Sequence, residues 1–381
     1  MVELGTLITQ AKTVRCGESN YPVLSMTMHD GLVLQDDRFK KAIASKDKSD
    51  YKVVYRDQLV ISFPIDEGVL ATQRITDAGI VSPAYGIWDV DQEKVVPEFL
   101  EYALRCKRSI AYYKTKLRGS TARRRSLPTP TLLAHTVPLP SIEEQKYVLD
   151  LIHKVETIIH LRKDELKELD ALTKARFAEL FGNPYSSDFK FEKCKLLEIA
   201  TKVTDGEHGT VPRVNKGEGP LYVMARNITQ NNAMDFSELS YIPQENHDKI
   251  YSRCNPEKGD LLLVCVGATV GKVALVPDME PFSLARSVAL IKPDKKIVTS
   301  EFLLHLMNSD YIQNQIQNSL HAAAQAGLYT KTIASLEVFA PPMRLQKQFS
   351  EFVEKIDKSK LLEARQAGFI AKNRPTNTFC R

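Results

Sequence analysis

Residues 139–148 read Leu-Pro-Ser-Ile-Glu-Glu-Gln-Lys-Tyr-Val, and residues 340–349 read Ala-Pro-Pro-Met-Arg-Leu-Gln-Lys-Gln-Phe. In both stretches proline closes one segment, and Gln-Lys then opens a run with apolar residues at helical spacing. Ser141 is followed three residues later by Glu144, the pattern of a capping box in which side chains satisfy the first backbone N–H groups of a helix. Each stretch is therefore predicted to start a helix.

Both predicted helices carry an apolar stripe whose members lie four and three residues apart, a spacing typical of a coiled coil. The first stripe is Val148, Ile152, Val155 and Ile159, and the second is Leu345, Phe349, Phe352 and Ile356.

The two helices are expected to differ in length. Neither Gly nor Pro occurs from Ser141 to Phe181, which predicts a helix of about 40 residues that ends at Gly182-Asn183-Pro184. The second pattern fades near Leu362, so Gly368 and Pro375 are expected to end that helix after about 25 residues.

The segments before the helices also match each other. Glu98-Phe99-Leu100 corresponds to Glu301-Phe302-Leu303, and a resemblance further upstream joins residues 55–61 to residues 257–263. Matches in constant order over such a length indicate an internal repeat, so a pseudo-two-fold arrangement is expected. The predicted domains are residues 1–140, a spacer helix 141–184, residues 185–341, and a shorter second spacer helix and tail 342–381.

Within each half, short β-branched runs alternate with turn residues and with short helical segments, which predicts a mixed sheet with helices and an α+β fold class. The predicted strands are Tyr51–Val54, Leu59–Phe63, Leu261–Val266, Lys272–Val276 and Ser287–Ile291, and the predicted helices are Pro97–Lys107 and Ser300–Asn308.

The charge distribution favours a nucleic-acid partner. No Asp or Glu occurs between Tyr102 and Ile142, whereas this stretch holds nine Lys and Arg residues. Such a run is often a solvated basic helix and loop, but cations without nearby acids repel one another, and phosphate is their usual counter-charge.

The composition narrows the class of protein. No apolar run is long enough for a transmembrane helix, and the N-terminus lacks the pattern of a secretory signal, so a cytoplasmic location is expected. The six cysteines are scattered, which indicates reduced thiols and no CxxC zinc motif. His and Cys do not cluster, so no metal site is expected.

Several motifs together resemble the specificity subunit of type I restriction–modification systems. Besides the two Pro-to-Gln helix starts, they are Leu180-Phe181-Gly182-Asn183-Pro184, Asp205-Gly206-Glu207-His208, Met224-Ala225-Arg226-Asn227-Ile228, Gly267-Ala268-Thr269-Val270-Gly271-Lys272-Val273-Ala274 and Ser287-Val288-Ala289-Leu290-Ile291. The first domain departs from the family pattern, because residues 62–68 replace the usual Gly-Thr-x-Gly-Lys turn.

The resemblance implies a non-catalytic DNA reader without a cofactor. It implies two target-recognition domains that each read half of a bipartite sequence, and two helices packed as an antiparallel coiled coil that spaces them. It also implies double-stranded DNA, methyltransferase subunits and motor-nuclease subunits as partners. Because the second helix is shorter, the first could expose an apolar stripe that recruits a second copy or a partner.

The basic loop from Gly119 to Arg125 is the strongest candidate DNA contact, because hydroxyls and Gly permit close approach and guanidinium groups bind phosphate or guanine in a bidentate way. Its counterpart is residues 325–331. The candidate contacts are Arg118, Ser120, Thr121, Arg123, Arg124 and Arg125 in the first domain, and His208, Arg226, Lys272, Arg286, Tyr329 and Lys331 in the second. The competing interpretations are a plain basic loop, a surface histidine and internal salt-bridge partners.

Two alternatives from other classes remain open. A self-contained methyltransferase or nuclease would need motifs that the chain lacks. Gly267 to Lys272 has the wrong spacing for a P-loop and is followed by Val273 rather than Ser or Thr, and Asn183-Pro184-Tyr185 is interpreted as a helix end. A coiled-coil scaffold that binds no DNA would leave the acid-free basic stretch unexplained.

Overall fold

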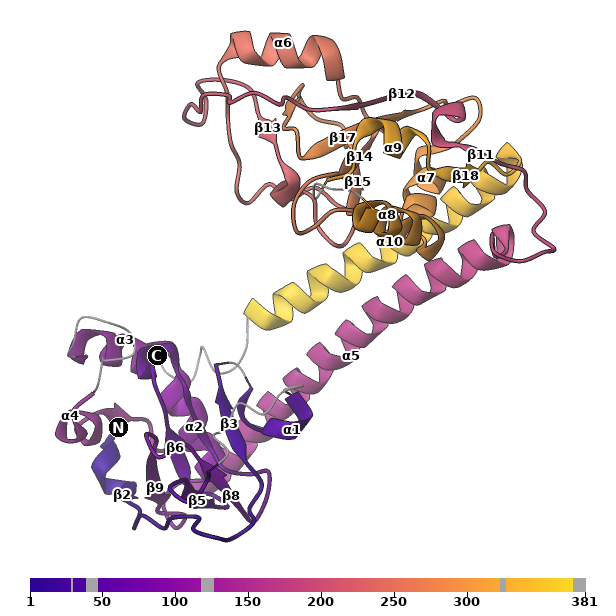
Figure 1. The fold of residues 1–381 in the computed structure, drawn as a ribbon. Coiled ribbons are helices and arrows are strands. Elements are labelled where there is room, and N and C mark those ends of the chain that lie inside the picture. The colour runs from indigo at the N-terminus through magenta and orange to yellow at the C-terminus, as the bar shows by residue number, and fades with distance from the viewer. Residues whose placement is uncertain (29, 39–46, 118–126, 323–326, 373–381) are drawn as a thin grey trace. The chain divides into compact units, whose positions relative to one another are not determined.

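The computed structural model describes residues 1–28, 30–38, 47–117, 127–322 and 327–372. The chain forms two compact units (Figure 1). Unit 1 consists of Met1–Asp164 with Ala364–Arg381, and unit 2 of Glu165–Glu363. Among the described helices, none is both long enough and apolar enough to cross a membrane.

Unit 1 combines short strands with short helices ahead of its long helix. Its elements are β1 (Val2–Glu3), η1 (Leu4–Thr6), β2 (Ile8–Gln10), β3 (Leu24–Thr27), β4 (Gly31–Leu34), α1 (Gln35–Arg38), β5 (Lys52–Tyr55), β6 (Leu59–Ile61), η2 (Ile65–Glu67), β7 (Leu70–Thr72), β8 (Ala78–Val81), β9 (Gly86–Val90), α2 (Pro97–Arg105), α3 (Lys107–Lys116), α4 (Thr129–Leu133) and β10 (Thr136–Val137).

The main sheet of unit 1 has the strand order β2-β9-β6-β7, with every neighbouring pair antiparallel. Alternate residues of its strands pack into two different hydrophobic cores, because successive side chains of a strand point to opposite faces of the sheet. Leu59 and Trp88 pack with Phe99 of α2 on one face, whereas Val60 and Ile87 pack on the other.

Unit 2 also combines strands with short helices, and its strands β12 and β17 are six residues long. Its elements are β11 (Lys193–Lys195), η4 (Leu196–Glu198), β12 (Ala200–Asp205), β13 (Tyr222–Val223), η5 (Ala225–Asn227), α6 (Gln244–Cys254), β14 (Leu261–Val264), β15 (Val273–Leu275), β16 (Ser283–Leu284), β17 (Val288–Pro293), α7 (Ser300–Met307), α8 (Asp310–Ala322), α9 (Thr330–Ala334) and β18 (Glu337–Phe339).

The main sheet of unit 2 has the order β12-β17-β14-β15, again antiparallel throughout. Leu261 and Leu263 face a core shared with α7, α8 and α10, whereas Leu262 and Val264 face a core shared with α6 and the β13–β16 pair. Figure 1 shows α6 and α10 on opposite sides of this sheet. Burial on both faces explains the uninterrupted apolar run Leu261–Val264.

The internal repeat predicted from the sequence is confirmed at the level of topology. The orders β2-β9-β6-β7 and β12-β17-β14-β15 correspond strand for strand, and the antiparallel pairs β1–β10 and β11–β18 occupy equivalent places. The α+β fold class is confirmed as well. The predicted helix Pro97–Lys107 ends at Arg105, because Cys106 has extended backbone angles and separates α2 from α3.

A buried glutamine fixes each long helix to the unit before it. The amide of Gln145 accepts the Val96 N–H (2.8 Å) and donates to the carbonyls of Lys94 (3.1 Å) and Pro140 (2.9 Å). Gln346 makes the same three bonds, to the Thr299 N–H (2.8 Å) and to the carbonyls of Ile297 (2.9 Å) and Pro341 (2.7 Å). Both side chains are fully buried, so the repeated Gln-Lys motif is a structural anchor.

The long helices are α5 (Ile142–Phe181) and α10 (Met343–Lys372). The prediction for α5 is confirmed, including its capping box between Ser141 and Glu144. The predicted end of α10 was wrong, because the helix passes through Gly368 to Lys372. It is still ten residues shorter than α5, with 30 residues against 40.

Within unit 2 the end of α5 runs antiparallel to the start of α10. Phe177 lies edge-on to Phe349 with ring centroids 5.4 Å apart. One end of the contact is held by Lys360 Nζ, which lies 2.7 Å from Asp170 Oδ1. Residue numbers therefore rise on one helix as they fall on the other.

Candidate nucleic-acid interface

The loops at one end of the unit 2 sheet carry the candidate site. Because neighbouring strands are antiparallel, the ends of β12 and β14 meet the starts of β17 and β15 at the same end of the sheet. The segments that leave and enter these strands form what we call the loop end of the sheet.

All six described residues of the predicted site belong to this loop end or to segments bonded to it. His208 follows β12, Arg286 precedes β17 and Lys272 precedes β15. The N–H of Ala225, next to Arg226, donates to Ser287 Oγ (3.2 Å). Tyr329 and Lys331 follow a segment in which the Leu328 N–H donates to the Cys265 carbonyl (2.8 Å) and Gly327 bridges to Val266.

The side chains at the loop end are mostly exposed. Arg286, Tyr329 and Lys331 are exposed, and Lys272 is half-buried. Arg226 is exposed and donates from Nη2 to Ser240 Oγ (2.7 Å), a hydroxyl rather than a carboxylate. His208 Nε2 lies 2.6 Å from Asp205 Oδ2, so the histidine has an acidic partner three residues before it.

Gly206 allows the loop after β12 to approach the neighbouring chain. A Cβ at this position would lie 2.2 Å from the Leu284 carbonyl oxygen and 2.3 Å from that of Ala285. The loop is held there because the Glu207 N–H donates to Leu284 and the Arg286 N–H donates to Glu207 (2.9 and 3.0 Å). Only glycine permits this contact, which brings Glu207 and His208 beside Arg286.

The sequence prediction missed two arginines and one carboxylate here. Arg253, at the end of α6, donates from Nη2 to the Gly206 carbonyl (2.7 Å), and the same atom lies 3.7 Å from Glu207 Oε2. Arg213 lies over the ring of Tyr222, 4.4 Å from its centroid. Neither arginine belongs to a motif that the sequence analysis used. The sequence shows only that Arg213 follows the Asp205–His208 run by five residues.

Glu207 is held in its charged form. The Gly209 N–H donates to Oε1 (2.9 Å), and this bond is the largest cause that lowers the pKa of the carboxyl group, with Arg253 and Lys249 contributing. An ionised carboxylate accepts hydrogen bonds from the amino groups of cytosine or adenine but repels phosphate. The loop end therefore combines cations that attract a phosphate backbone with two carboxylates, Asp205 beside His208 and Glu207, whose charge suits it to a base edge.

The loop between β14 and β15 is a strand-to-strand turn. Gly267 and Gly271 have φ values of 108° and 97°, and β15 follows directly rather than the helix that a P-loop requires. The segment therefore lacks the strand–turn–helix arrangement of a P-loop. Asn183-Pro184-Tyr185 also follows the end of a helix as expected, since the Gly182 N–H (φ 75°) donates to the Ala178 carbonyl (2.8 Å).

The equivalent loop end of unit 1 is described in part. The predicted contacts Arg118, Ser120, Thr121, Arg123, Arg124 and Arg125 lie outside the described residues. Residues 62–68, which replace the family's usual turn, contain η2 and end at Gly68 (φ 75°). Among the residues that the structure describes, His, Cys, Asp and Glu form no group that could hold a metal ion.

Comparison with known proteins gives a family match over the second half of the chain. Residues 190–367 match the type I restriction modification DNA specificity domain. Two relatives from Methanocaldococcus jannaschii are the type I restriction enzyme MjaVIII specificity subunit (21% identical over 58% of this chain) and the putative type I restriction enzyme MjaX specificity subunit (24% over 70%). The chain spans 55% and 63% of the length of these two proteins.

Other relatives extend the match along the chain. The type I restriction enzyme EcoBI specificity subunit of Escherichia coli is 23% identical over 80% of this chain and 67% of its own length. Two solved structures share the fold over 100% of the chain. The S subunit from M. genitalium (13% identical, 94% of that chain) has a TM-score of 0.54. A chain from a study of complex assembly and conformational transition in the type I R-M system (17% identical, 95%) has a TM-score of 0.60.

Proposed function

We propose that the chain, whose residues 190–367 match the type I restriction modification DNA specificity domain, is the DNA-reading subunit of a type I restriction–modification complex. Residues 1–140 and 185–341 act as two target-recognition domains, each reading one half of a bipartite sequence. The helical segments 141–184 and 342–381 separate them. The chain performs no chemistry alone and directs methyltransferase and motor-nuclease subunits to the site.

One observation carries this proposal, namely that the same sheet, the same loop end and the same glutamine anchor occur twice. A duplicated reader suits a target in two parts, as dimeric DNA-binding proteins suit two half-sites. Exposed cations at the loop end of unit 2 supply contacts to phosphates and guanine edges. The acid-free stretch Tyr102–Ile142 supplies cations in unit 1.

Mapping of methylated adenines tests the proposal. The chain is co-expressed with its cognate methyltransferase subunit in a host without other DNA methylation, and modified bases are located by single-molecule sequencing. A motif of two unlike halves with a fixed gap is the expected result. A palindrome built from one half would mean that two copies of the chain use one reader each.

Two outcomes would overturn the proposal. Binding of S-adenosylmethionine by the isolated chain, with methylation in the absence of a partner, would identify a self-contained methyltransferase. Failure to bind duplex DNA at low salt, together with unmodified DNA, would identify a scaffold protein.

A further inference from the structure

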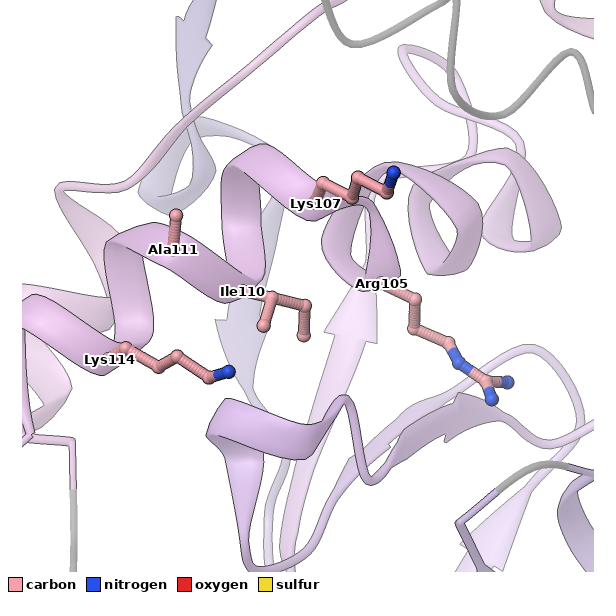
Figure 2. A pocket seen from close by; sticks show the side chains of 5 residues that line it. All are labelled: Arg105, Lys107, Ile110, Ala111 and Lys114. Carbon is pink, nitrogen blue, oxygen red and sulfur yellow. The ribbon is translucent and has the colours of Figure 1, made fainter. Parts of the chain in front are cut away.

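A basic hollow lies on unit 1 where α2 meets α3. Its volume is about 290 Å³, and it is lined by Arg105, Lys107, Ile110, Ala111 and Lys114. Figure 2 shows Ile110 and Lys114 on the same side of α3, with Arg105 extending from the end of α2. The lining thus combines three positively charged side chains with two apolar ones, Ile110 and Ala111.

The hollow adjoins the loop end of the unit 1 sheet. The turn that joins β6 to β7 contains η2 and Gly68, and a Cβ on Gly68 would lie 3.3 Å from Ile110 Cδ1 and 3.8 Å from Arg105 Cγ. This turn occupies the place that the β14–β15 turn occupies in unit 2. In the sequence, α3 leads directly into the arginine-rich residues 118–125.

The equivalent place in unit 2 is not basic. Gly68 and Gly271, which differ by 203 in residue number, both have positive φ, and they face Ile110 of α3 and Gln313 of α8. With the same difference, Ile110 corresponds to Gln313, whose Nε2 donates to the carbonyls of Gly271 (3.0 Å) and Met307 (2.7 Å).

The cations of the hollow have no counterparts in unit 2. At a difference of 203, the residues that replace Arg105, Lys107 and Lys114 are Asn308, Asp310 and Gln317.

The residues that line the hollow include three cations and no acid. Arg105 already uses some of its N–H donors within the protein, because Nη1 donates to Glu101 Oε1 (3.1 Å) and Nη2 to the Met28 carbonyl (3.2 Å). On the adjoining turn, Asp66 is buried and Glu67 is exposed. Lys107 and Lys114 are both exposed, and among the described residues neither forms an ion pair.

We propose that this hollow binds the sugar–phosphate backbone of DNA beside the sequence that unit 1 reads, and that unit 2 makes no equivalent contact. The inference rests on the proposed function. Lys107 and Lys114 pair with phosphate oxygens, and Ile110 and Ala111 contact the apolar face of a deoxyribose. Such contacts fix position and carry no base preference.

Salt dependence of DNA binding tests this assignment. The full chain and the variant Lys107→Gln/Lys114→Gln are titrated with a random-sequence DNA duplex at increasing salt. Each phosphate contact contributes about 0.9 to the slope of log K against log salt, so the variant is expected to lose about 2 from the slope. The control Lys146→Gln/Lys163→Gln removes the same charge from exposed positions of α5 and is expected to leave the slope unchanged.

Three results would overturn the assignment. If the wild-type chain binds duplex DNA and the variant keeps its slope, the hollow is not a DNA contact while the proposed function stands. If the variant instead loses the methyltransferase subunit, the hollow binds an acidic protein surface. If the variant changes one half of the methylated motif, the lysines read bases rather than the backbone. A wild-type chain that binds no duplex would end the proposed function as well.

Discussion

Glu207 places a negative charge on a surface that carries several exposed cations. Its carboxylate is fixed by the Gly209 N–H and lies near Arg253, so it remains ionised at neutral pH. A charge that repels phosphate at a DNA interface is retained where it accepts a hydrogen bond from a base amino group or positions a neighbouring arginine. The following prediction tests this role.

Glu207→Gln keeps the oxygen that accepts the Gly209 N–H but removes the charge. Binding to random duplex DNA is expected to strengthen, because the repulsion of phosphate is gone. Discrimination at one position of the target is expected to relax by about 1–3 kcal/mol, which appears as extra bases tolerated in the methylated motif. The control Glu245→Gln removes an exposed carboxylate from α6, and an equal effect of both variants would contradict the prediction.

His135 is the residue whose environment makes unit 1 sensitive to acid. Burial, with a smaller contribution from Arg108, lowers its pKa to about 4. Ser109 Oγ donates to the Ala103 carbonyl (2.7 Å), so the bond between Ser109 Oγ and His135 Nε2 (2.8 Å) has the neutral imidazole as donor. Between pH 6.5 and 4 the unfolded chain binds a proton that the folded unit does not, and stability therefore falls as the pH is lowered through this window.

His135→Gln retains a donor and removes the titration. We expect the variant to be less stable at pH 7, because the stacking on Tyr112 is lost, but to lose less stability on acidification, with a difference of up to about 3 kcal/mol. Trp88 is the single tryptophan and lies in the core of unit 1, so its fluorescence during urea unfolding follows this unit. His160→Gln, at an exposed position, is the control, and identical pH profiles for wild type and His135→Gln would refute the account.

The residues that the sequence prediction missed are those whose role depends on distant packing. Arg253 meets the loop after β12 only because α6 ends there, 47 positions further along the chain. The role of Arg213 becomes apparent only in the structure, where its guanidinium group lies over the ring of Tyr222. By contrast, His208, Lys272 and Arg286 could be predicted, because each adjoins a strand end and antiparallel pairing brings those ends together.

At the scale of elements, the buried glutamines determine how each long helix starts. A side chain with no exposure that satisfies one backbone donor and two backbone acceptors cannot be replaced by an apolar residue without leaving those groups unpaired. The repeat could be predicted for this reason, since the same bonds require the same Pro and Gln spacing twice.

Gln145→Leu preserves the size of the side chain but removes all three bonds. Unit 1 is expected to lose about 2–5 kcal/mol of stability, because buried backbone groups lose their partners. The urea midpoint reported by Trp88 measures this loss. Lys146→Leu changes the next, exposed position and is expected to shift the midpoint little, so similar shifts for both variants would exclude the anchoring role.

The end of α10 could not be predicted from local signals. A single glycine inside a helix costs about 1 kcal/mol, and Ala367, Ala371 and Lys372 around it are good helix formers. The helix therefore continues through Gly368. The hollow between α2 and α3 was equally hidden, because the contrast between Ile110 and Gln313 appears only when the two turns are compared in space.

At the scale of the whole molecule, each unit has its own cores and its own loop end. Residues 1–164 contribute to one set of hydrophobic clusters and residues 165–363 to another. Damage to the loop end of one unit is therefore expected to leave the other unit folded and able to read DNA.

Arg286→Ala is expected to relax one half of the methylated motif and leave the other half unchanged. Loss of a bidentate contact to guanine costs about 1–3 kcal/mol of discrimination at one position, and the methylome of the co-expressed variant shows which half is affected. Arg176→Ala, on α5, removes an arginine away from either loop end. Changes in both halves after Arg286→Ala would contradict independent reading.

The glutamine anchors also bear on where this chain can be cut and rejoined without loss of a helix attachment. Every side-chain hydrogen bond of Gln145 returns to residues 94–140, and every side-chain hydrogen bond of Gln346 returns to residues 297–341. A genetic exchange with breakpoints just after the two Gln-Lys motifs would therefore transfer residues 147–347 without separating either glutamine from its side-chain partners. The exchanged segment thus brings with it the glutamine and the backbone groups that anchor its own second helix.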